Sequence, residues 1–375
     1  MKKIVIAPGA FKHSLTASAA AQAIAAGLRR SGLEAELHLL PIADGGNGTL
    51  DAFLAAGGQR IAVTVEDPAG RPVQAAFGLL PDGKTAVIEM ALASGLELMD
   101  TWQLNPLRAS TYGTGQLMQA ALARGVERVI VGMGGSATVD GGAGCLQALG
   151  VSLLDAYGVE VPRGGGSLDR VFVIDTHKLD PRWRDVEVLI ASDVSNPTLG
   201  PQGAAAVFGP QKGATPEQVA LLERNLSHFF RVVRDQLGVD VRDTPGGGAA
   251  GALSAGLVAF LGGRIESGVD VILKHSGFAS LLDQADLVVT GEGRMDGQTI
   301  HGKGPIGVAQ MARQRGVPTV ALVGGLDIDD AALHRAGVQA ALPIVTGPMP
   351  LERALDDAAA LLERAALRLG YLLQV

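Results

Sequence analysis

The sequence predicts an α/β protein with a Rossmann-like parallel sheet, and two observations support this fold class. Short runs rich in Val, Ile and Leu recur along the chain, as expected of strands buried on both faces of a parallel sheet. Helical stretches follow most of these runs. The runs are IVIAPGAF from Ile4, VIVGMGG from Val129, VLIASD from Val188, LVVTGEG from Leu287 and VALVGG from Val320.

The clearest helix follows the run at Ile4. Ser14 or Thr16 can cap its N-terminus, an Ala-rich sequence carries it to Arg30, and Gly32 suits the position just beyond its end. A strand, a loop and a capped helix form the first half of a βαβ unit. Because ligands of open sheets bind beyond the carboxyl ends of the strands, the loops after the runs are where we expect chemistry.

The middle of the chain has a different sequence pattern. EDPAGRPVQAAFGLLPDGKTAVIEM is typical of strands linked by turns at Pro68–Gly70 and Pro81–Gly83. The 375 residues also suit two domains rather than one. We therefore expect residues 1–65 and 285–375 to form a discontinuous Rossmann-like domain, with a second α/β domain, residues 66–284, inserted into it.

Composition excludes several classes of partner. Hydrophobic residues make up 47% of the chain and charged residues 18%, which predicts a globular protein. The formal charge of -7, without a block of Lys or Arg, argues against nucleic acid but leaves a small anionic substrate open. The N-terminal apolar core is too short for a signal peptide, and no apolar stretch is long enough to span a bilayer. We expect a cytoplasmic protein with no membrane partner, and its oligomeric state is left open.

Cysteine and histidine usage argues against two kinds of chemistry. Cys145 is the only cysteine and lies in the apolar segment AGCLQALG, so we interpret it as a buried core residue. The histidines are scattered with no i, i+4 pair, which makes a zinc site improbable.

The loop from Val131 to Gly144, VGMGGSATVDGGAG, follows an expected strand and leads into a helix. Its glycines let backbone N–H groups approach an anion, and Ser136 and Thr138 add hydroxyl groups. Gly132, Gly134 and the later Asp155 also form an interrupted dinucleotide fingerprint. A third interpretation is a tight crossover that needs glycine only for its geometry.

The loop VVTGEGRMDGQTIHGKGPIGVAQ follows the run at Leu287 and precedes a helix that Pro305 would open. It satisfies a P-loop signature except at the last position, where Gly304 replaces the Ser or Thr that would ligate Mg²⁺. Its carboxylates suit Mg²⁺ and its cations suit phosphoryl charge, although a solvated surface loop is the alternative. The charged residues in question are Glu292, Arg294, Asp296, His301 and Lys303.

Two Gly-rich turns carry further carboxylates. PIADGGNGT contains Asp44 and Asn47, and IASDVSNPTLG contains Asp193 and Asn196. Either aspartate can serve as a general base or metal ligand, and either can instead only stabilise a turn.

Two segments remain open between a ligand-binding and a structural role. Lys12 and Ser14 lie between the first strand and the first helix, a position suited to binding a carboxylate or phosphate. Ser14 can instead only cap the helix. The segment TPGGGAAGALSAGL, from Thr244 to Leu257, is either a phosphate cradle or a site of close packing.

Together these loops resemble those of the bacterial glycerate kinase family, the type that forms 2-phosphoglycerate. One departure is that Gly9 and Ala10 stand where the family more often has Asp and Ser, so any role of that aspartate is not transferred. The matching segments, in the order of the family and over nearly the whole chain, are FKHSLTA at 11–17, PIADGGNGT at 41–49, GMGGSATVDGGAG at 132–144, SDVSNPTLGPQGAAAVFGPQKGA at 192–214, PGGGAAGALSAG at 245–256 and TGEGRMDGQTIHGKGP at 290–305.

The resemblance implies a kinase that uses ATP and Mg²⁺ to phosphorylate D-glycerate, with an active site in a cleft between two α/β domains. Phosphoryl transfer needs positioning and neutralised oxygens more than covalent chemistry, which suggests a division of labour. Asp193 is the preferred general base and Asp44 the second choice. The other assignments are Gly134, Gly135, Ser136 and Thr138 for phosphates; Glu292 and Asp296 for Mg²⁺; and Lys12, Ser14, Asn47, Arg294 and Lys303 for the substrate or the transferred phosphoryl group.

Two other classes of function stay open at this stage. An NAD-dependent hydroxy-acid oxidoreductase would use the fingerprint at Gly132, Gly134 and Asp155, and would not need ATP. A non-catalytic metabolite-binding protein would use the same anion-binding loops and would be stabilised by its ligand without turnover.

Overall fold

The structure is a computed structural model that describes residues 1–43, 45–55, 57–297 and 304–375. No helix in these ranges is both long enough and apolar enough to cross a bilayer. The chain divides into two compact units, each with its own sheet and core. The first unit contains Met1–Asp44, Asp51–Gly57 and Val269–Val375, and the second contains Gly45–Leu50 and Gly58–Gly268.

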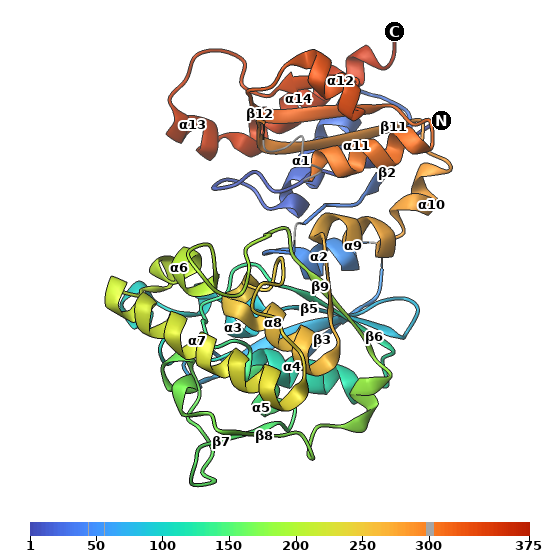
Figure 1. Ribbon diagram of the computed structural model, residues 1–375. Helices are drawn as coiled ribbons and strands as arrows, with labels where there is room; N and C mark the ends of the chain where they lie inside the picture. The colour runs from blue at the N-terminus through green and yellow to red at the C-terminus, as the bar shows by residue number, and fades with distance from the viewer. Residues whose placement is uncertain (44, 56, 298–303) are drawn as a thin grey trace. The chain divides into compact units, whose positions relative to one another are not determined.

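The first unit is built on a five-stranded sheet in which all neighbouring strands are parallel, in the order β13-β12-β11-β1-β2 (Figure 1). This confirms the expected Rossmann-like parallel sheet. Its strands are β1 (Lys2–Ile6), β2 (Ala35–Leu39), β11 (Leu287–Met295), β12 (Thr319–Leu326) and β13 (Ala340–Pro343).

Helices cover both faces of this sheet, because successive strand residues point to opposite sides. On β12, Leu322 packs into a cluster with α1 (Ala17–Arg30) and α14 (Ala358–Leu372). Its neighbours Ala321 and Val323 pack into a separate cluster. That second cluster contains residues of α11 (Pro305–Gln314) and α12 (Asp330–Ala336). The other helices that lie wholly or partly in this unit are α2 (Thr49–Leu54), α9 (Gly268–His275), α10 (Phe278–Leu282) and α13 (Leu351–Asp356).

Helix α1 begins and ends where its sequence indicated. The Oγ1 atom of Thr16 accepts a hydrogen bond from the Ala19 amide at 3.1 Å, so Thr16 and not Ser14 is the N-cap. The Ser14 hydroxyl donates instead to the Phe11 carbonyl oxygen at 3.0 Å. Gly32 follows the helix with a φ of +79°, the left-handed conformation that favours glycine after a helix end.

The second unit is built on a mixed six-stranded sheet in the order β10-β9-β6-β5-β4-β3. The four strands from β10 to β5 are parallel, and β4 and β3 add antiparallel strands joined by the expected turns. Its strands are β3 (Gln59–Glu66), β4 (Pro72–Leu79), β5 (Thr85–Glu89), β6 (Arg128–Gly132), β9 (Glu187–Ala191) and β10 (Arg264–Glu266), and a separate two-stranded sheet pairs β7 (Ser152–Leu154) with β8 (Val173–Asp175).

The helices of the second unit pack into two hydrophobic clusters, one against the six-stranded sheet and one around α7 and the small sheet. Figure 1 shows α7 as the long helix of this unit. The helices are α3 (Ala91–Ser94), α4 (Tyr112–Leu122), α5 (Ala143–Ala148), α6 (Ala204–Phe208), α7 (Pro216–Leu237) and α8 (Ala249–Leu261), with short 3₁₀ turns η1 (Leu96–Leu98), η2 (Thr101–Gln103), η3 (Gly165–Arg170), η4 (Pro181–Arg184) and η5 (Pro210–Lys212).

This division differs from the boundaries expected near residues 66 and 284. The first boundary falls earlier because β3 pairs with β4 along its whole length and therefore belongs to the second sheet. The second falls earlier because the contacts of α9 and α10 place residues from Val269 onward in the first unit. Turns and apolar runs in a sequence do not reveal such pairings.

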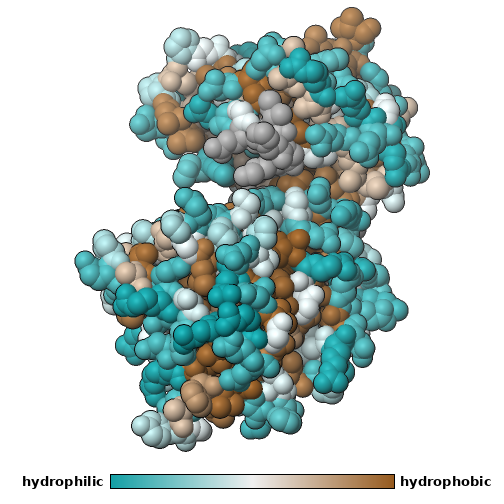
Figure 2. All heavy atoms as spheres, viewed as in Figure 1, coloured by the Kyte–Doolittle hydropathy of each residue, from teal (hydrophilic) through white to brown (hydrophobic). Residues whose placement is uncertain are grey.

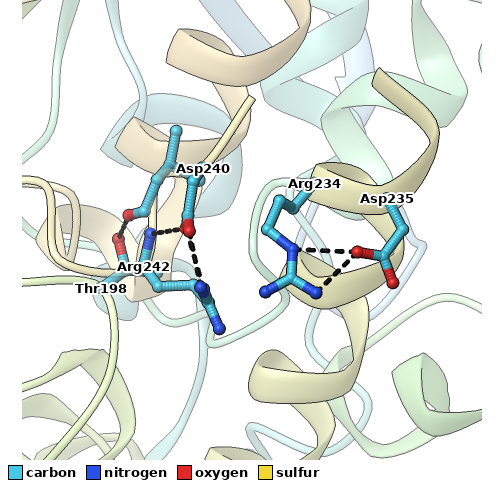
Figure 3. A network of polar contacts seen from close by, with 6 residues as sticks. Thr198, Arg234, Asp235, Asp240 and Arg242 are labelled. Carbon is cyan, nitrogen blue, oxygen red and sulfur yellow. Dashed lines mark hydrogen bonds and ion pairs between the residues drawn. The ribbon is translucent and has the colours of Figure 1, made fainter. Parts of the chain in front are cut away.

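The loop after β9 is fastened to the segment that follows α7 (Figure 3). The buried Thr198 hydroxyl donates to the Val241 carbonyl oxygen at 2.5 Å, and the Leu199 amide donates to the Arg242 carbonyl oxygen at 3.2 Å. The Arg242 side chain donates to both carboxylate oxygens of Asp240, which lowers the pKa of Asp240 to about 2. These bonds fix the far end of a loop whose first residues are site candidates.

Hydrophilic and apolar residues both reach the surface of the second unit (Figure 2). Trp102 and Tyr157 are 81% and 92% exposed. Single exposed aromatic side chains of this kind are normal in folded proteins.

We predict that Gly27→Ala destabilises the protein by about 1–3 kcal/mol, the usual effect of overpacking. Gly27 lies where α1 crosses α14, and a Cβ there would overlap the backbone oxygen of Glu363. Urea unfolding measures the change. Gln22→Ala, at an exposed position on the same helix, is the control and should change the free energy of unfolding by less than about 0.5 kcal/mol. Equal midpoints for Gly27→Ala and the wild type would contradict the packing.

Candidate functional site

The first unit carries a pocket at the point where its strand order reverses. From β1 the chain moves to β2 on one side, and from β11 it moves to β12 and β13 on the other, so the reversal lies between β1 and β11. Ligands of open α/β sheets bind at the carboxyl ends of the strands at such a point. A pocket of about 780 Å³ lies there, lined by residues that follow β1 and β13, by the ends of β11 and β12, and by residues of α13.

The pocket brings together the candidate site residues that the structure describes in this unit. Lys12, Ser14, Glu292, Arg294 and Asp296 all line it. Lys12 is exposed, and within the described ranges its ammonium group makes no ion pair. A lysine in this state can bind an anion without first breaking a bond to the protein.

The positive charge of Arg294 is already partly balanced by nearby carboxylates. Its guanidinium donates to Asp327 at 2.9 Å and lies 3.8 Å from the Asp296 carboxylate. All three side chains are well exposed to solvent, where such pairs contribute little to stability. An anionic ligand can therefore exchange for these carboxylates at small cost.

The donor set of the pocket fits Mg²⁺ bound together with a phosphate. Glu292 and Asp296 supply carboxylate oxygens, the ligands that Mg²⁺ prefers, and Mg²⁺ usually needs only one or two of them beside waters and substrate phosphates. In the described part of the chain, no group of three or more His, Cys, Asp or Glu side chains is placed to hold a metal ion. The described residues therefore offer two carboxylates, an incomplete ligand set for a metal ion.

Three predicted residues lie outside the described residues. They are Asp44, the second choice for general base, and His301 and Lys303 of the late Gly-rich loop.

The second unit gathers its candidate loops at one edge of the mixed sheet. The last residues of β5, β6 and β9 are Glu89, Gly132 and Ala191, and the strand register places them side by side. Glu89 is buried and its carboxylate accepts hydrogen bonds from the Gly48 and Leu50 amides, both at 3.1 Å. The turn at 45–50 is thereby held at the same edge as the loops after β6 and β9.

The turn at 45–50 and the glycine loop after β6 are in backbone contact. The Gly134 amide donates to the Gly45 carbonyl oxygen at 2.8 Å, and a Cβ on Gly134 would overlap the Cα of Gly46. The Asn47 side chain lies against Gly135 and donates to Glu97 at 2.6 Å. The glycines are thus needed because the two backbone segments approach each other closely, as the crossover interpretation proposed. Whether the loop can also bind an anion depends on its free backbone amides.

Two consecutive amides of this loop are available to a ligand. Gly135 is exposed and has a φ of +76°, and its carbonyl oxygen accepts from the Leu96 amide. Among the residues that the structure describes, no acceptor lies within hydrogen-bond distance of the Gly135 or Ser136 amide. Consecutive N–H groups around a left-handed residue form a concave site for anions.

A buried lysine contacts the same loop. The Nζ atom of Lys212 donates to the Ser136 hydroxyl oxygen and to the Thr138 carbonyl oxygen, both at 2.7 Å. Lys212 is only 1% exposed. Thr138 is also fully buried, and its hydroxyl oxygen has no hydrogen-bond partner within the described residues. Of the two predicted hydroxyl groups, Ser136 therefore lies next to the available amides and Thr138 faces the interior.

Asp140 is the acidic residue buried near Lys212, Ser136 and Thr138. Its carboxylate accepts from the amides of Thr111, Gly142 and Gly144 and from the Thr111 hydroxyl, at 2.8–3.3 Å. Burial raises the pKa of the Asp140 carboxyl, and the four donors act against that rise. Burial also lowers the pKa of Lys212 to about 7, with the charge of Asp140 opposing the change.

Asp193 follows β9 at the same edge of the sheet and is half-buried. Its Oδ1 atom accepts from the Gly268 amide at 3.0 Å. Asn196, in the same loop, uses its side-chain amide to donate to the Gln202 carbonyl oxygen at 2.8 Å, which is a turn-forming role.

The glycine-rich segment at 244–257 serves close packing. Cβ atoms on Gly251 and Gly256 would overlap backbone oxygens of the loop after β6, and the Gly141 amide donates to the Gly251 carbonyl oxygen at 3.0 Å. Ala250 and Ala252 take left-handed φ angles of 52° and 69°, which are uncommon for residues with a Cβ. Of the two interpretations from sequence, the structure supports packing.

The dinucleotide interpretation fails at Asp155. This residue follows β7, which belongs to the separate two-stranded sheet. Its carboxylate accepts from the Tyr157 and Val159 amides and pairs with Arg170 at 3.0 Å, so it forms a turn rather than a ribose-binding group. Cys145 is buried, as expected, and burial raises the pKa of its thiol.

Sequence reasoning did not single out Lys212, Asp140 or Glu89. All three are charged and buried, a state that composition and periodicity do not reveal. One signal was present: Lys212 is the one charged residue in the mostly apolar segment AAAVFGPQKGA.

The fold and these sites define a two-unit α/β protein with anion-binding groups at the carboxyl ends of strands in both units. Comparison with known proteins is more specific. Residues 4–374 match the Glycerate kinase family. The chain is 48% identical to "Glycerate kinase" of Bacillus subtilis (strain 168) over 97% of this chain and 96% of that protein.

Two further relatives agree with this match. The chain is 46% identical to "Glycerate 2-kinase" of Escherichia coli (strain K12), over 95% of this chain and 94% of that protein. A crystal structure from Salmonella typhimurium LT2, provisionally assigned as glycerate kinase 2, superposes with a TM-score of 0.87 at 43% identity, covering 100% of this chain and 98% of that one. The chain therefore belongs to the glycerate kinase family.

The buried lysine leads to a prediction about stability. Between its folded pKa of about 7 and the ordinary lysine value of 10.5, the unfolded chain holds a proton that the folded chain lacks. Stability then rises with pH across this window. We expect the wild type to gain stability relative to Lys212→Met between pH 6 and pH 9, measured by urea unfolding. A difference between the two proteins that is independent of pH would contradict the lowered pKa.

Proposed function

We propose that the protein transfers a phosphoryl group from ATP to the 2-hydroxyl of D-glycerate and forms 2-phosphoglycerate. The observation that carries this proposal is the match to relatives named glycerate kinase over nearly the whole chain. The choice of the 2-hydroxyl follows the relative named glycerate 2-kinase.

The glycine loop of the second unit binds phosphate groups of the nucleotide in this proposal. The available amides of Gly135 and Ser136, with the ammonium group of Lys212 against the same loop, supply hydrogen-bond donors and positive charge. Such groups are fixed by the fold before the ligand arrives, so they stabilise charge without reorganisation. Gly134 holds the loop against the turn at 45–48.

The pocket of the first unit contributes cations and metal ligands. Lys12 and Arg294 bind the glycerate carboxylate or the charge of the transferred group, with Ser14 beside them as a hydroxyl donor. Glu292 and Asp296 would hold Mg²⁺, which neutralises phosphate charge when bound. Lys303 is proposed for the same phosphoryl charge.

Asp193 is the proposed general base, with Asp44 as second choice and Asn47 as a substrate-binding residue. Phosphoryl transfer asks the protein mainly to place the hydroxyl in line and to accept its proton. A carboxylate at the end of β9 whose Oδ1 is already held by the Gly268 amide is oriented for that task.

We predict glycerate-dependent turnover in a coupled ADP-release assay with ATP and Mg²⁺. Phosphorus NMR of the product should show a phosphate ester on the 2-hydroxyl. Reactions without glycerate are the control. ATP- or glycerate-induced stabilisation without turnover would instead support a metabolite-binding protein, and a 3-phosphate product would overturn the regiochemistry.

We predict that Asp193→Asn lowers kcat by about 10²- to 10⁴-fold, the usual contribution of a general base. The folded structure should persist, because an asparagine oxygen can still accept from the Gly268 amide.

Asp185→Asn is the matched control for this variant. Asp185 is an exposed carboxylate that precedes β9, whereas Asp193 follows it. The control should keep wild-type kcat and KM. An Asp193→Asn enzyme with nearly full kcat would show that another group accepts the proton, and a change confined to KM would indicate a role in substrate binding.

A further inference from the structure

Lys212 occupies an environment that a lysine rarely takes. It ends the short turn η5, and its side chain is 1% exposed. Burial of an ammonium group costs free energy that an apolar side chain of similar size would not. A purely structural role therefore leaves the choice of lysine unexplained.

The hydrogen bonds of Lys212 hold its ammonium group against the loop at 134–138. An ammonium group has three donors, and two of them go to the Ser136 hydroxyl oxygen and the Thr138 carbonyl oxygen at 2.7 Å. Both acceptors belong to the loop whose Gly135 and Ser136 amides have no acceptor in the described part of the chain. The positive charge thus lies against the same short loop as these amides, in contact with the side chain of Ser136.

Few of the described negatively charged groups lie close enough to Lys212 to balance its charge. Asp140, from the loop after β6, is the charged group among the described residues whose field acts on Lys212, and it raises the pKa of the lysine. Its carboxylate is already bonded to donors from Thr111, Gly142 and Gly144. No other described charged group, from η5 or from the elements packed around it, shifts the lysine.

We propose that Lys212 is a positioning residue that takes up a proton when the loop at 134–138 binds the phosphates of ATP. This inference rests on the proposed function, which assigns those phosphates to the loop. A phosphate on the Gly135 and Ser136 amides would favour the charged form of the lysine that contacts this loop. By reciprocity, the charged lysine would favour the phosphate and hold Ser136 in place for it.

The direction of the pH effect follows from the free protein. With a pKa of about 7, Lys212 is mostly protonated at pH 6 and mostly neutral at pH 8 before the ligand binds. A bound phosphate raises that pKa, so proton uptake on binding is small at pH 6 and approaches about one proton per site at pH 8. Above pH 7 the affinity for ATP should fall by up to about tenfold per pH unit, until the pKa of the complex is reached.

Isothermal titration calorimetry with Mg-ATP tests this coupling in the full-length protein. Titrations at pH 6 and pH 8, each in two buffers with different ionisation enthalpies, give the number of protons taken up. The wild type should take up about one proton more at pH 8 than Lys212→Met. The Met variant should bind ATP about ten- to hundredfold more weakly at pH 6, as expected from losing charged hydrogen bonds.

Two variants separate this role from a structural one. Lys212→Arg keeps a charge that does not titrate, so it should recover part of the affinity while losing the pH-dependent proton uptake. Lys84→Met removes an exposed lysine of the same unit that pairs with Glu127 at 2.8 Å, and it should behave as the wild type. If circular dichroism shows that Lys212→Met is unfolded, the comparison of the wild type with Lys212→Arg decides the question.

Equal proton uptake in the wild type and in the folded Lys212 variants would overturn the inference. Gly134→Ala distinguishes that result from failure of the proposed function. Its Cβ would displace the loop from Gly46, so ATP should bind more weakly if the loop holds phosphate. Unchanged ATP affinity in Gly134→Ala would overturn the phosphate assignment and this inference with it. Weakened affinity without a difference in proton uptake would overturn this inference alone.

Discussion

Backbone-to-backbone contact at the carboxyl edge of the second sheet is the constraint on which the glycine loop depends. Gly134 lies against Gly46, and Gly251 lies against the backbone of Thr138, at distances that leave no room for a Cβ. Two segments far apart in sequence, around Gly46 and around Gly251, are thereby packed against the loop after β6. These contacts restrict the backbone of the loop, in which Gly135 is exposed and Ser136 is buried.

The two units place charge in different ways. In the first unit Lys12, Arg294 and Asp296 line an open pocket, where water screens their interactions and side chains can rearrange around a ligand. In the second unit Lys212 and Asp140 are buried, so their fields are stronger and their positions are fixed by hydrogen bonds. The first arrangement suits binding and release, and the second suits a preorganised site.

Local sequence was sufficient for the strands at the five apolar runs, β1, β6, β9, β11 and β12, and for the first helix. Apolar runs, a capping Thr16 and a left-handed Gly32 act over a few residues. The topological rule for parallel sheets also anticipated that candidates after β1 and at the end of β11 would share a pocket. Lys212 and the unit boundaries were not predictable in this way. Burial of a lysine and the pairing of β3 with β4 are decided by residues distant in the chain.

An acidic protein that handles anionic substrates must keep its attraction for phosphate local. With a formal charge of -7, the chain carries more acidic than basic side chains, so its net charge does not attract anions. Backbone amides act only on a ligand that touches them, and the charge of Lys212 is shielded from other solutes by its burial. In the proposed site, attraction for a phosphate-bearing ligand would then depend on where the positive groups lie and not on the net charge of the protein.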